Sequence, residues 1–575
     1  MPIASPESTL LQPGGKVDVR LRRPATDGTR VRSGQRARGL LAADRGDTAR
    51  RVVGRHAPFL VVFLAGAVLR VVTFLAYQPG LAYAQDSFSY LHDAHTGVPN
   101  VIRPEGYAFF LRLVEGLTGQ FFMVAVAQHA FGLVIGAALY LLLYRLGVGR
   151  WLAMLGAAPI LLDSYQIYIE QFVLSETLFA FLAAVAAVIL LWPSERWPEA
   201  RVAAAGAILG LATVTRTVGI ALIVGAVVLL VVRRSTWRSW LSFVMPVALI
   251  LGGYGFWFRS AHGSFGLEQY HGYTLAARVS PFADCRGLSL PPDQEIFCDS
   301  RPPKERWGAD VYLWAEVAPL RRRDGVPGPV RDRSAARFGS RIIRHQPLDY
   351  LRTVVGTFSR YFAPGDPVGP KDNSVKPLQF LTWYTEGPWH PEYPPSDPYN
   401  TNWTWPEGVK NQVIPARWGF DLKEQDVKVN EPLARRLRQY QQVGRVPGPL
   451  LALALLVAVV PALQRVGSAR RRLRTGALFL AALGLLVLLL PSAIGTLDYR
   501  YRLPALVFLP AAGILGLALA RGRVLKRRAV QARRFDVAGP QPLLGPRTRT
   551  SPPLEPSLFD LEGAEAELGG RSSES

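Results

Sequence analysis

Cysteine is scarce in this sequence, because the 575 residues contain only Cys285 and Cys298. Two cysteines allow at most one disulfide, and both lie in a long segment that we place outside the membrane, where conditions are oxidising. Their separation of 13 positions makes a bridge sterically easy, so we predict that they are joined. Two alternatives stay open, a pair of free thiols and a zinc site with two cysteine ligands.

Acidic residues are also few, with 43 Asp and Glu against 66 Lys and Arg and a net charge of +23. Such an excess can indicate nucleic-acid binding, but the basic residues are concentrated in 1–56, in "QRVGSARRRLRT" and in "RGRVLKRRAVQARR". These segments flank apolar runs, where membrane topology and anionic lipid explain them. We therefore expect no nucleic-acid partner. The sequence also lacks a cleavable signal, so we expect the first apolar run to remain as an anchor. It contains no internal repeat.

Apolar residues make up 49% of the chain and cluster repeatedly into runs of about 17 to 25 residues, the length of a membrane-spanning helix. We predict an all-α polytopic membrane protein with ten spans. The fifth and sixth are short and flank "TRT", so two full spans and a re-entrant pair both stay open. The predicted spans are 57–77, 121–144, 151–168, 172–192, 202–215, 217–232, 239–258, 447–464, 475–495 and 503–520.

The bias of Lys and Arg toward cytoplasmic links sets the predicted orientation in a plasma membrane. It places both termini in the cytoplasm, and the first loop, 78–120, outside. The link after the seventh span is dense in Trp, Tyr and Pro, which predicts a mixed exterior loop domain. The expected parts are a disordered basic tail at 1–56, an N-terminal membrane module at 57–258, the exterior domain at 259–446, a C-terminal membrane module at 447–520 and a second disordered tail at 521–575.

Four polar segments should meet at the outer face. They are "AQDSFSYLHDAHTGVPNVIRPEGY" with Asp86, Tyr90, Arg103 and Glu105, "LLDSYQIYIEQFVLSETLF" with Asp163 and Glu176, "TRT" with Arg216, and "LDYRYRLP" with Asp498, Arg500 and Arg502. Arginines in short links normally lie on the cytoplasmic side, so the arginines in these outer links are exceptions to that bias. Ionisable groups at membrane depth usually mark a substrate site, and the arginine fork suits phosphate oxygens. The pattern therefore predicts a ligand with an anionic phosphate, such as a lipid-phosphate-linked sugar.

The order of five motifs resembles the GT-C superfamily of membrane glycosyltransferases, in the style of protein O-mannosyltransferases and the aminoarabinose transferase of lipid A. The motifs, spread over 57–520, are "QDSFSY", "RPEGYAFFL", "SETLF", "GLATVTRTVGI" and "YRYRLPAL". This resemblance implies a GT-C-like helical fold and a polyprenyl-phosphate sugar donor bound at the outer leaflet. It also implies an acidic catalytic residue in the first outer loop, which by position is Asp86.

The chemistry of sugar transfer assigns a role to each charged group. Asp86 would take the proton of the acceptor, and cationic groups would stabilise the departing lipid phosphate. The predicted phosphate-binding residues are Arg103, Arg216, Arg500 and Arg502, and the supporting residues are Tyr90, Glu105, Asp163, Glu176 and Asp498. We expect no nucleotide or redox cofactor. A pair of neighbouring carboxylates would be the obvious site for a divalent metal ion, but Asp86 has no acidic neighbour in the sequence. Dependence on a divalent metal therefore stays open.

Simpler interpretations stand beside these roles. Asp86 could cap a helix, Glu176 could have no role, and Arg500 and Arg502 could extend to lipid headgroups. The cluster His92, Asp93 and His95 has the composition of a metal site, and Arg70, inside the first span, is expected to pair with a neighbouring helix or to snorkel.

The predicted function is transfer of a sugar, with mannose as the candidate, from a polyprenyl-phosphate carrier to an exterior acceptor. The acceptor could be an envelope glycan, a protein or a secreted metabolite. One alternative is a transporter or flippase for lipid-linked sugars, which should show related halves and polar residues at mid-bilayer. Another is a structural partner in an envelope-assembly complex.

Overall fold

The computed structural model describes residues 30–194, 198–314, 326, 328–367, 379–381, 413–414, 425–426, 428–464, 467, 470–495 and 497–537. Contacts divide the chain into two compact units, Met1–Arg521 and Gly522–Ser575. All the interactions described below lie within the first unit.

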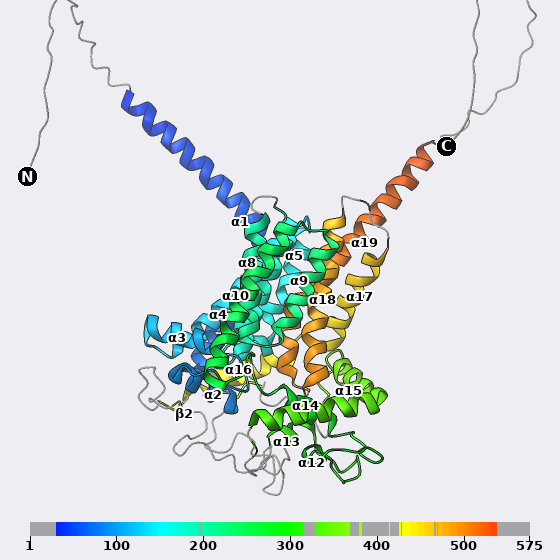
Figure 1. Ribbon diagram of the computed structural model, residues 1–575. Coiled ribbons are helices and arrows are strands. Elements are labelled where there is room, and N and C mark those ends of the chain that lie inside the picture. The colour runs from blue at the N-terminus through cyan, green and yellow to red at the C-terminus, as the bar shows by residue number, and fades with distance from the viewer. Residues whose placement is uncertain are drawn as a thin grey trace, which may run out of the picture. The chain divides into compact units, whose positions relative to one another are not determined.

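Helices make up nearly all the regular structure (Figure 1). The helices are α1 (Arg30–Ala76), α2 (Ala84–Thr96), α3 (Gly106–Thr118), α4 (Phe122–Arg145), α5 (Arg150–Leu162), α6 (Ser164–Ile169), α7 (Ser175–Leu191), α8 (Pro198–Thr215), α9 (Gly219–Val232), α10 (Trp237–His262), α11 (His271–Val279), α12 (Pro292–Glu295), α13 (Ala309–Trp314), α14 (Gly328–His345), α15 (Pro347–Arg360), α16 (Glu431–Val443), α17 (Gly448–Leu463), α18 (Arg471–Ile494), the 3₁₀ helix η6 (Tyr499–Arg502) and α19 (Leu503–Val537).

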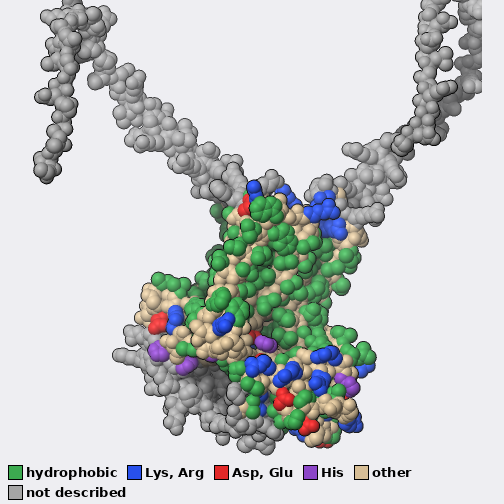
Figure 2. Space-filling model, in the orientation of Figure 1, with side chains coloured by type: hydrophobic (Ala, Val, Ile, Leu, Met, Phe, Trp, Pro, Cys, Tyr) green, Lys and Arg blue, Asp and Glu red, His purple; other side chains and the backbone are tan. Residues whose placement is uncertain are grey.

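Every predicted span lies mostly in helix, which confirms the helical polytopic fold. Within the described residues, five helices are long and apolar enough to cross a membrane: Val53–Ala76 of α1, α4, α10, α18 and Tyr499–Arg521. The bent pair α16 and α17 would add a sixth. Helices α5, α7 and α9 are apolar but shorter, so the count of ten spans stays a prediction. Figure 2 shows hydrophobic side chains covering the bundle between two ends that carry charged groups.

The structure differs from the prediction inside one span and at both tails. The predicted span 151–168 is broken, because Asp163 has an extended backbone between α5 and α6 and its side chain accepts a hydrogen bond from Gln166 N. An aspartate in this position caps a new helix instead of continuing the old one. The helices α1 and α19 also extend into the predicted tails, over 30–56 and 521–537. Arginine, alanine and leucine are frequent there and favour helix; the remaining tail residues lie outside the described residues.

An ion pair inside the bundle joins helices that are distant in sequence. Arg70 of α1 donates to both carboxylate oxygens of Glu170, at 2.7 and 2.8 Å, and also to the backbone oxygens of Gly66, Ile160 and Leu161. The last two carbonyls belong to the end of α5, where a helix leaves acceptors unsatisfied. Arg70 thus pairs with a neighbouring element, as predicted, and every nitrogen of its guanidinium has a partner.

In the described part of the chain, four short strands form two antiparallel pairs. In the first, β1 (Tyr77–Gln78) pairs with β4 (Lys428–Val429), with Tyr77 opposite Val429. In the second, β2 (Val413–Ile414) pairs with β3 (Gln425–Asp426). The first pair fastens the residues just before α16 to the end of α1.

The segment after α10 has a hydrophobic core of its own, separate from the core of the bundle. Its centre contains Tyr273, Phe297, Tyr312, Phe338 and Ile342 from α11 to α14 and the loops between them. In Figure 1, α12 to α15 lie at the same end of the bundle as α2 and α3, and His262 at the end of α10 hydrogen-bonds to Pro99 O in the loop between those two helices.

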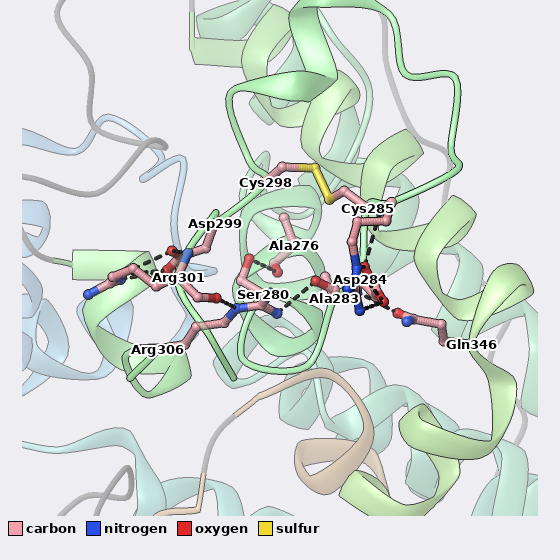
Figure 3. Close-up of a disulfide and its surroundings, with 11 residues drawn as sticks. Ala276, Ser280, Ala283, Asp284, Cys285, Cys298, Asp299, Arg301, Arg306 and Gln346 are labelled. Carbon is pink, nitrogen blue, oxygen red and sulfur yellow. Dashed lines mark hydrogen bonds and ion pairs between the residues drawn. A yellow bond between two sulfur atoms is a disulfide. The ribbon is translucent and has the colours of Figure 1, made fainter. Parts of the chain in front are cut away.

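A disulfide joins Cys285 and Cys298, with 6.2 Å between their Cα atoms (Figure 3). Its surroundings are held by further bonds: Arg306 donates to Ala283 O at 2.7 Å and Asp284 N donates to Gln346 Oε1 at 3.0 Å. The bridge therefore closes a loop that carries α12 beside α14.

Removing this bridge should loosen the segment after α10. Replacing both cysteines by serine releases the loop in the unfolded state, which should lower the free energy of unfolding by about 3 kcal/mol. Urea titration followed by tryptophan fluorescence measures the change. Reduced native protein should behave like the double variant; equal stability of the native and double-variant proteins would contradict the prediction.

The orientation can be tested with reporter fusions. Arginine-rich links are retained in the cytoplasm, so a reporter fused after residue 470 should be active on the cytoplasmic side, and one fused after residue 350 on the exterior side. A cytoplasmic result at residue 350 would overturn the outer location of the charged groups described next.

Candidate active site

Asp86 lies in the first turn of α2, where it contacts two arginines. Its Oδ1 lies 2.9 Å from Arg103 Nη2 and its Oδ2 lies 2.6 Å from Arg500 Nη1. The residue at the N-cap of α2 is Tyr83, whose side chain makes no cap hydrogen bond, and its backbone N donates to Ser87 Oγ at 2.7 Å. The alternative in which Asp86 serves as the cap is therefore wrong; its carboxylate is an ion-pair partner.

These arginines set the protonation of Asp86. Burial by itself would raise the pKa of the carboxyl group, but the charges of Arg103 and Arg500, and the hydrogen bonds they donate, outweigh burial and hold that pKa well below its usual range. Asp86 is therefore ionised at neutral pH. While both arginines remain in place it is also a weak base.

Six charged side chains from four segments gather here, on the face that the sequence predicts to be outside, and we refer to them as the outer ionic cluster. They are Asp86 of α2, Arg103 of the following loop, Glu176 of α7, Arg216 between α8 and α9, and Asp498 and Arg500 of the turn that contains η6. Three carboxylates thus face three guanidinium groups. The structure brings together these residues from the first loop to the last link, as the sequence predicts for them.

Arg500 is the centre of the cluster. Besides Asp86, its guanidinium lies 2.6 Å from Asp498 Oδ2 and 3.5 Å from Glu176 Oε1. Glu176 in turn lies 2.7 Å from Arg216 Nη1. One chain of ion pairs therefore connects all six residues, so a ligand that moves Arg500 would change the pairing of all three carboxylates.

Exposure divides the cluster into a floor and an open face. The side chains of Glu176 and Asp498 are 2% and 7% exposed, whereas those of Asp86 and Arg216 are 23% and 21% exposed. Burial raises the pKa of Asp498, with Arg500 acting against it. A ligand would therefore meet Asp86, Arg103 and Arg216 first.

Aromatic rings surround the arginines. Arg103 lies over Tyr90, with 5.0 Å from its Cζ to the ring centroid, and Arg500 lies 4.9 Å from the ring of Tyr83. Tyr501 lies under both Arg500 and Arg216. Ring faces attract guanidinium groups and fix their planes. Sequence reasoning missed Tyr83 and Tyr501, although the alternation of tyrosine and arginine in "DYRYR" was a signal for the second.

The loop that carries Arg103 is fixed by Asn100. Its side-chain amide donates to both carboxylate oxygens of Asp93, at 3.1 and 2.9 Å, and its backbone N donates to Glu105 Oε1 at 2.7 Å. Burial, together with the charge of Asp93, raises the pKa of Glu105 to about 8. Glu105 and Asp93 thus hold the loop that carries Arg103, and a supporting role for Glu105 stays a prediction.

Gly106 lets this loop approach the end of α8. A Cβ atom at this position would lie 2.7 Å from Thr215 N and 2.7 Å from Val214 O, which is too close for any larger residue. The start of α3 therefore packs directly against the residues that precede Arg216. The motif "RPEGY" joins two parts of the site through this contact.

Two predicted site residues lie apart from the outer ionic cluster. Arg502 Nη1 lies 3.2 Å from Asp366 Oδ1, and Arg445 lies 2.5 Å from the other oxygen of Asp366. Arg500 and Arg502 contact different partners because residues two positions apart in a 3₁₀ turn point in different directions. Asp163 caps α6 and accepts a hydrogen bond from Val446 N at 2.7 Å. Both residues therefore hold elements together.

The predicted metal-like cluster has a different arrangement. His92 and His95 are exposed, whereas Asp93 is buried and bound to Asn100 and Ser89. Across the described part of the chain, no group of three or more His, Cys, Asp or Glu side chains could hold a metal ion. The expectation that no cofactor is required stays a prediction.

Comparison with known proteins gives one family. Residues 114–268 match the model of dolichyl-phosphate-mannose-protein mannosyltransferases. This segment contains Glu176 and Arg216 but not Asp86 or Arg500. No curated protein matches the chain.

Some solved structures show a limited likeness to this chain. One is ArnT from Cupriavidus metallidurans bound to undecaprenyl phosphate, with 14% identity, a TM-score of 0.30, and coverage of 81% of this chain and 78% of that one. Another is the Archaeoglobus fulgidus oligosaccharyltransferase, with 12% identity, a TM-score of 0.36 and coverage of 82% and 52%. Likeness at this level carries no argument about function. The family match, over its segment, confirms the resemblance to GT-C membrane glycosyltransferases that the motifs predict.

Proposed function

We propose that this protein transfers a sugar from a polyprenyl-phosphate carrier to an acceptor at the outer face of the plasma membrane. The observation that carries the proposal is the outer ionic cluster, which combines a partly exposed carboxylate with three arginines beside membrane-spanning helices. The family match supports a transferase, and its description makes mannose the candidate sugar. The undecaprenyl phosphate bound to ArnT is a carrier of the proposed class.

The donor phosphate would bind first. Arginine forms strong, often bidentate hydrogen bonds with phosphate oxygens, and Arg103, Arg216 and Arg500 border the open face of the cluster. Each of them is already paired with a carboxylate. The phosphate would therefore compete with Asp86 for Arg103 and Arg500.

This competition would activate the base. With both arginines in place, the pKa of Asp86 is held low, and a low pKa makes a poor proton acceptor. As the phosphate engages the arginines, their interaction with Asp86 weakens and its basicity rises. Asp86 would therefore become an effective base only when the donor is bound.

The transfer step follows from these positions. The acceptor hydroxyl oxygen forms a bond to the anomeric carbon of the sugar as the bond from that carbon to the phosphate oxygen breaks. Asp86 takes the proton of the hydroxyl group, and the electron pair of the broken bond stays on the departing polyprenyl phosphate. The arginines stabilise that phosphate as its charge increases. The configuration at the anomeric carbon is inverted.

Replacement of Asp86 by asparagine tests its role as the base. The change keeps the size of the side chain and removes the proton acceptor, so transfer should fall by about two to four orders of magnitude. The assay follows sugar release from a purified polyprenyl-phosphate mannose donor, with donor binding measured in parallel.

Asp498→Asn is the matched control, because it also removes a carboxylate paired with Arg500 but leaves Asp86 in place. It should retain much more turnover than Asp86→Asn. Near-normal turnover by Asp86→Asn would contradict the assignment of Asp86 as the base. Glu176 or Asp498 would then be the candidate base.

The phosphate site is tested by comparing two neighbouring arginines. Arg500→Gln should weaken donor binding by about 10- to 100-fold, because a charged hydrogen-bond donor to the phosphate is lost, and turnover should fall as well. Arg502→Gln should leave donor affinity unchanged, because that side chain contacts Asp366. Size-exclusion profiles establish that both variants are folded. An equal loss of donor affinity in the two variants would mean that Arg502 also contacts the phosphate.

A further inference from the structure

Helix α15 exposes a row of apolar side chains. Leu348, Leu351 and Val355 are 66%, 55% and 55% exposed, and their spacing of three and four residues places them along one face of the helix. We call these three residues the α15 apolar row. Large apolar side chains gathered on one exposed face usually mark an interaction surface.

The opposite face of α15 is fastened to the end of α18. Tyr350 donates from its hydroxyl group to Ala493 O at 3.1 Å. Arg278 of α11 donates to Ser492 O at 2.6 Å and to Thr357 Oγ1 at 2.8 Å. Because α18 is long and apolar enough to span a membrane, these bonds place α15 at the level where that span ends.

The apolar surface of the bundle reaches the same level. Leu489 and Ile494, in the last two turns of α18, are 44% and 38% exposed. Figure 2 shows hydrophobic side chains extending along the bundle to the charged region at this end. The α15 apolar row therefore lies near the edge of the apolar surface of the bundle.

Charge on α15 also fits a lipid surface. Arg352 lies between members of the row in sequence and its side chain is 78% exposed, at 3.1 Å from Asp349. Arg344, which precedes α15, is exposed as well. Amphipathic helices with basic residues beside an apolar face lie in the plane of the membrane interface.

We propose that α15 is an interfacial helix whose apolar row enters the boundary between lipid headgroups and acyl chains, with Arg352 at the level of the lipid phosphates. The occupant of this face is thus phospholipid. The proposal does not depend on the sugar-transfer reaction.

The helix is also connected to the outer ionic cluster. Tyr361 follows α15 directly, is fully buried, and donates from its hydroxyl group to Asp498 O at 3.3 Å. Asp498 contacts Arg500 through its side chain. A helix held at the depth of the headgroups would therefore fix the depth of the cluster relative to the membrane surface.

Site-directed fluorescence in the full-length protein tests this proposal. The two native cysteines are joined, so a single cysteine introduced as Leu348→Cys, Leu351→Cys or Val355→Cys is the thiol available to an environment-sensitive dye. All three positions are exposed, so the changes should be tolerated. Each labelled protein is reconstituted into phosphatidylcholine and phosphatidylglycerol vesicles, with bromine on the acyl chains either near the headgroup or near the chain end.

The three labels should lose about half of their fluorescence or more with shallow bromines, and less with deep ones, because an interfacial helix inserts only to the acyl boundary. Arg337→Cys is the matched control. That side chain is 65% exposed on α14, and its label should be quenched little by either lipid.

Two results would overturn the proposal. One is quenching at the α15 apolar row no greater than at Arg337→Cys. The other is crosslinking of the introduced cysteines between two copies of the chain together with protection from the bromines, because the face would then be a protein interface.

Discussion

An ionised side chain next to a membrane must have a partner of opposite charge, and this constraint organises the structure. Transfer of an isolated charge out of water is very costly, whereas a paired and hydrogen-bonded charge is tolerated. Within the described residues, Arg502 with Asp366 and Arg445 forms one group of this kind. Two others are Arg70 with Glu170, inside the bundle, and the outer ionic cluster, at one end.

The last two groups differ in exposure, and this difference separates structure from function. Arg70 and Glu170 are 2% and 0% exposed, and the arginine uses all of its nitrogens on protein acceptors. No position is left for a ligand, so the pair can only hold helices together. In the outer ionic cluster, Asp86 and Arg216 keep about a fifth of their surface. There a ligand can exchange places with protein partners without crossing a packed core.

Much of this arrangement could be predicted from the sequence, because both main signals are local. Apolar runs predict helices through their length, and charged residues at the ends of those runs predict a shared outer face. The side chains at that face are harder to predict. Arg500 and Arg502 look equivalent in "YRYR", yet they contact Asp86 and Asp366, partners that lie hundreds of residues away from each other in the chain. Asn100, which fixes the loop of Arg103, resembles any turn residue in the sequence, and only its hydrogen bonds to Asp93 and Glu105 reveal its role.

The sequence distance between Asp86 and Arg500 has a consequence for synthesis of the protein. A ribosome completes Asp86 more than 400 residues before Arg500, the residue to which all three carboxylates of the cluster are linked. Until that last link is made, Asp86 and Glu176 lack their common cation, and the floor formed with Asp498 is missing. The cluster is therefore complete only in a chain that includes Arg500, so partial chains that end before this residue carry no assembled site.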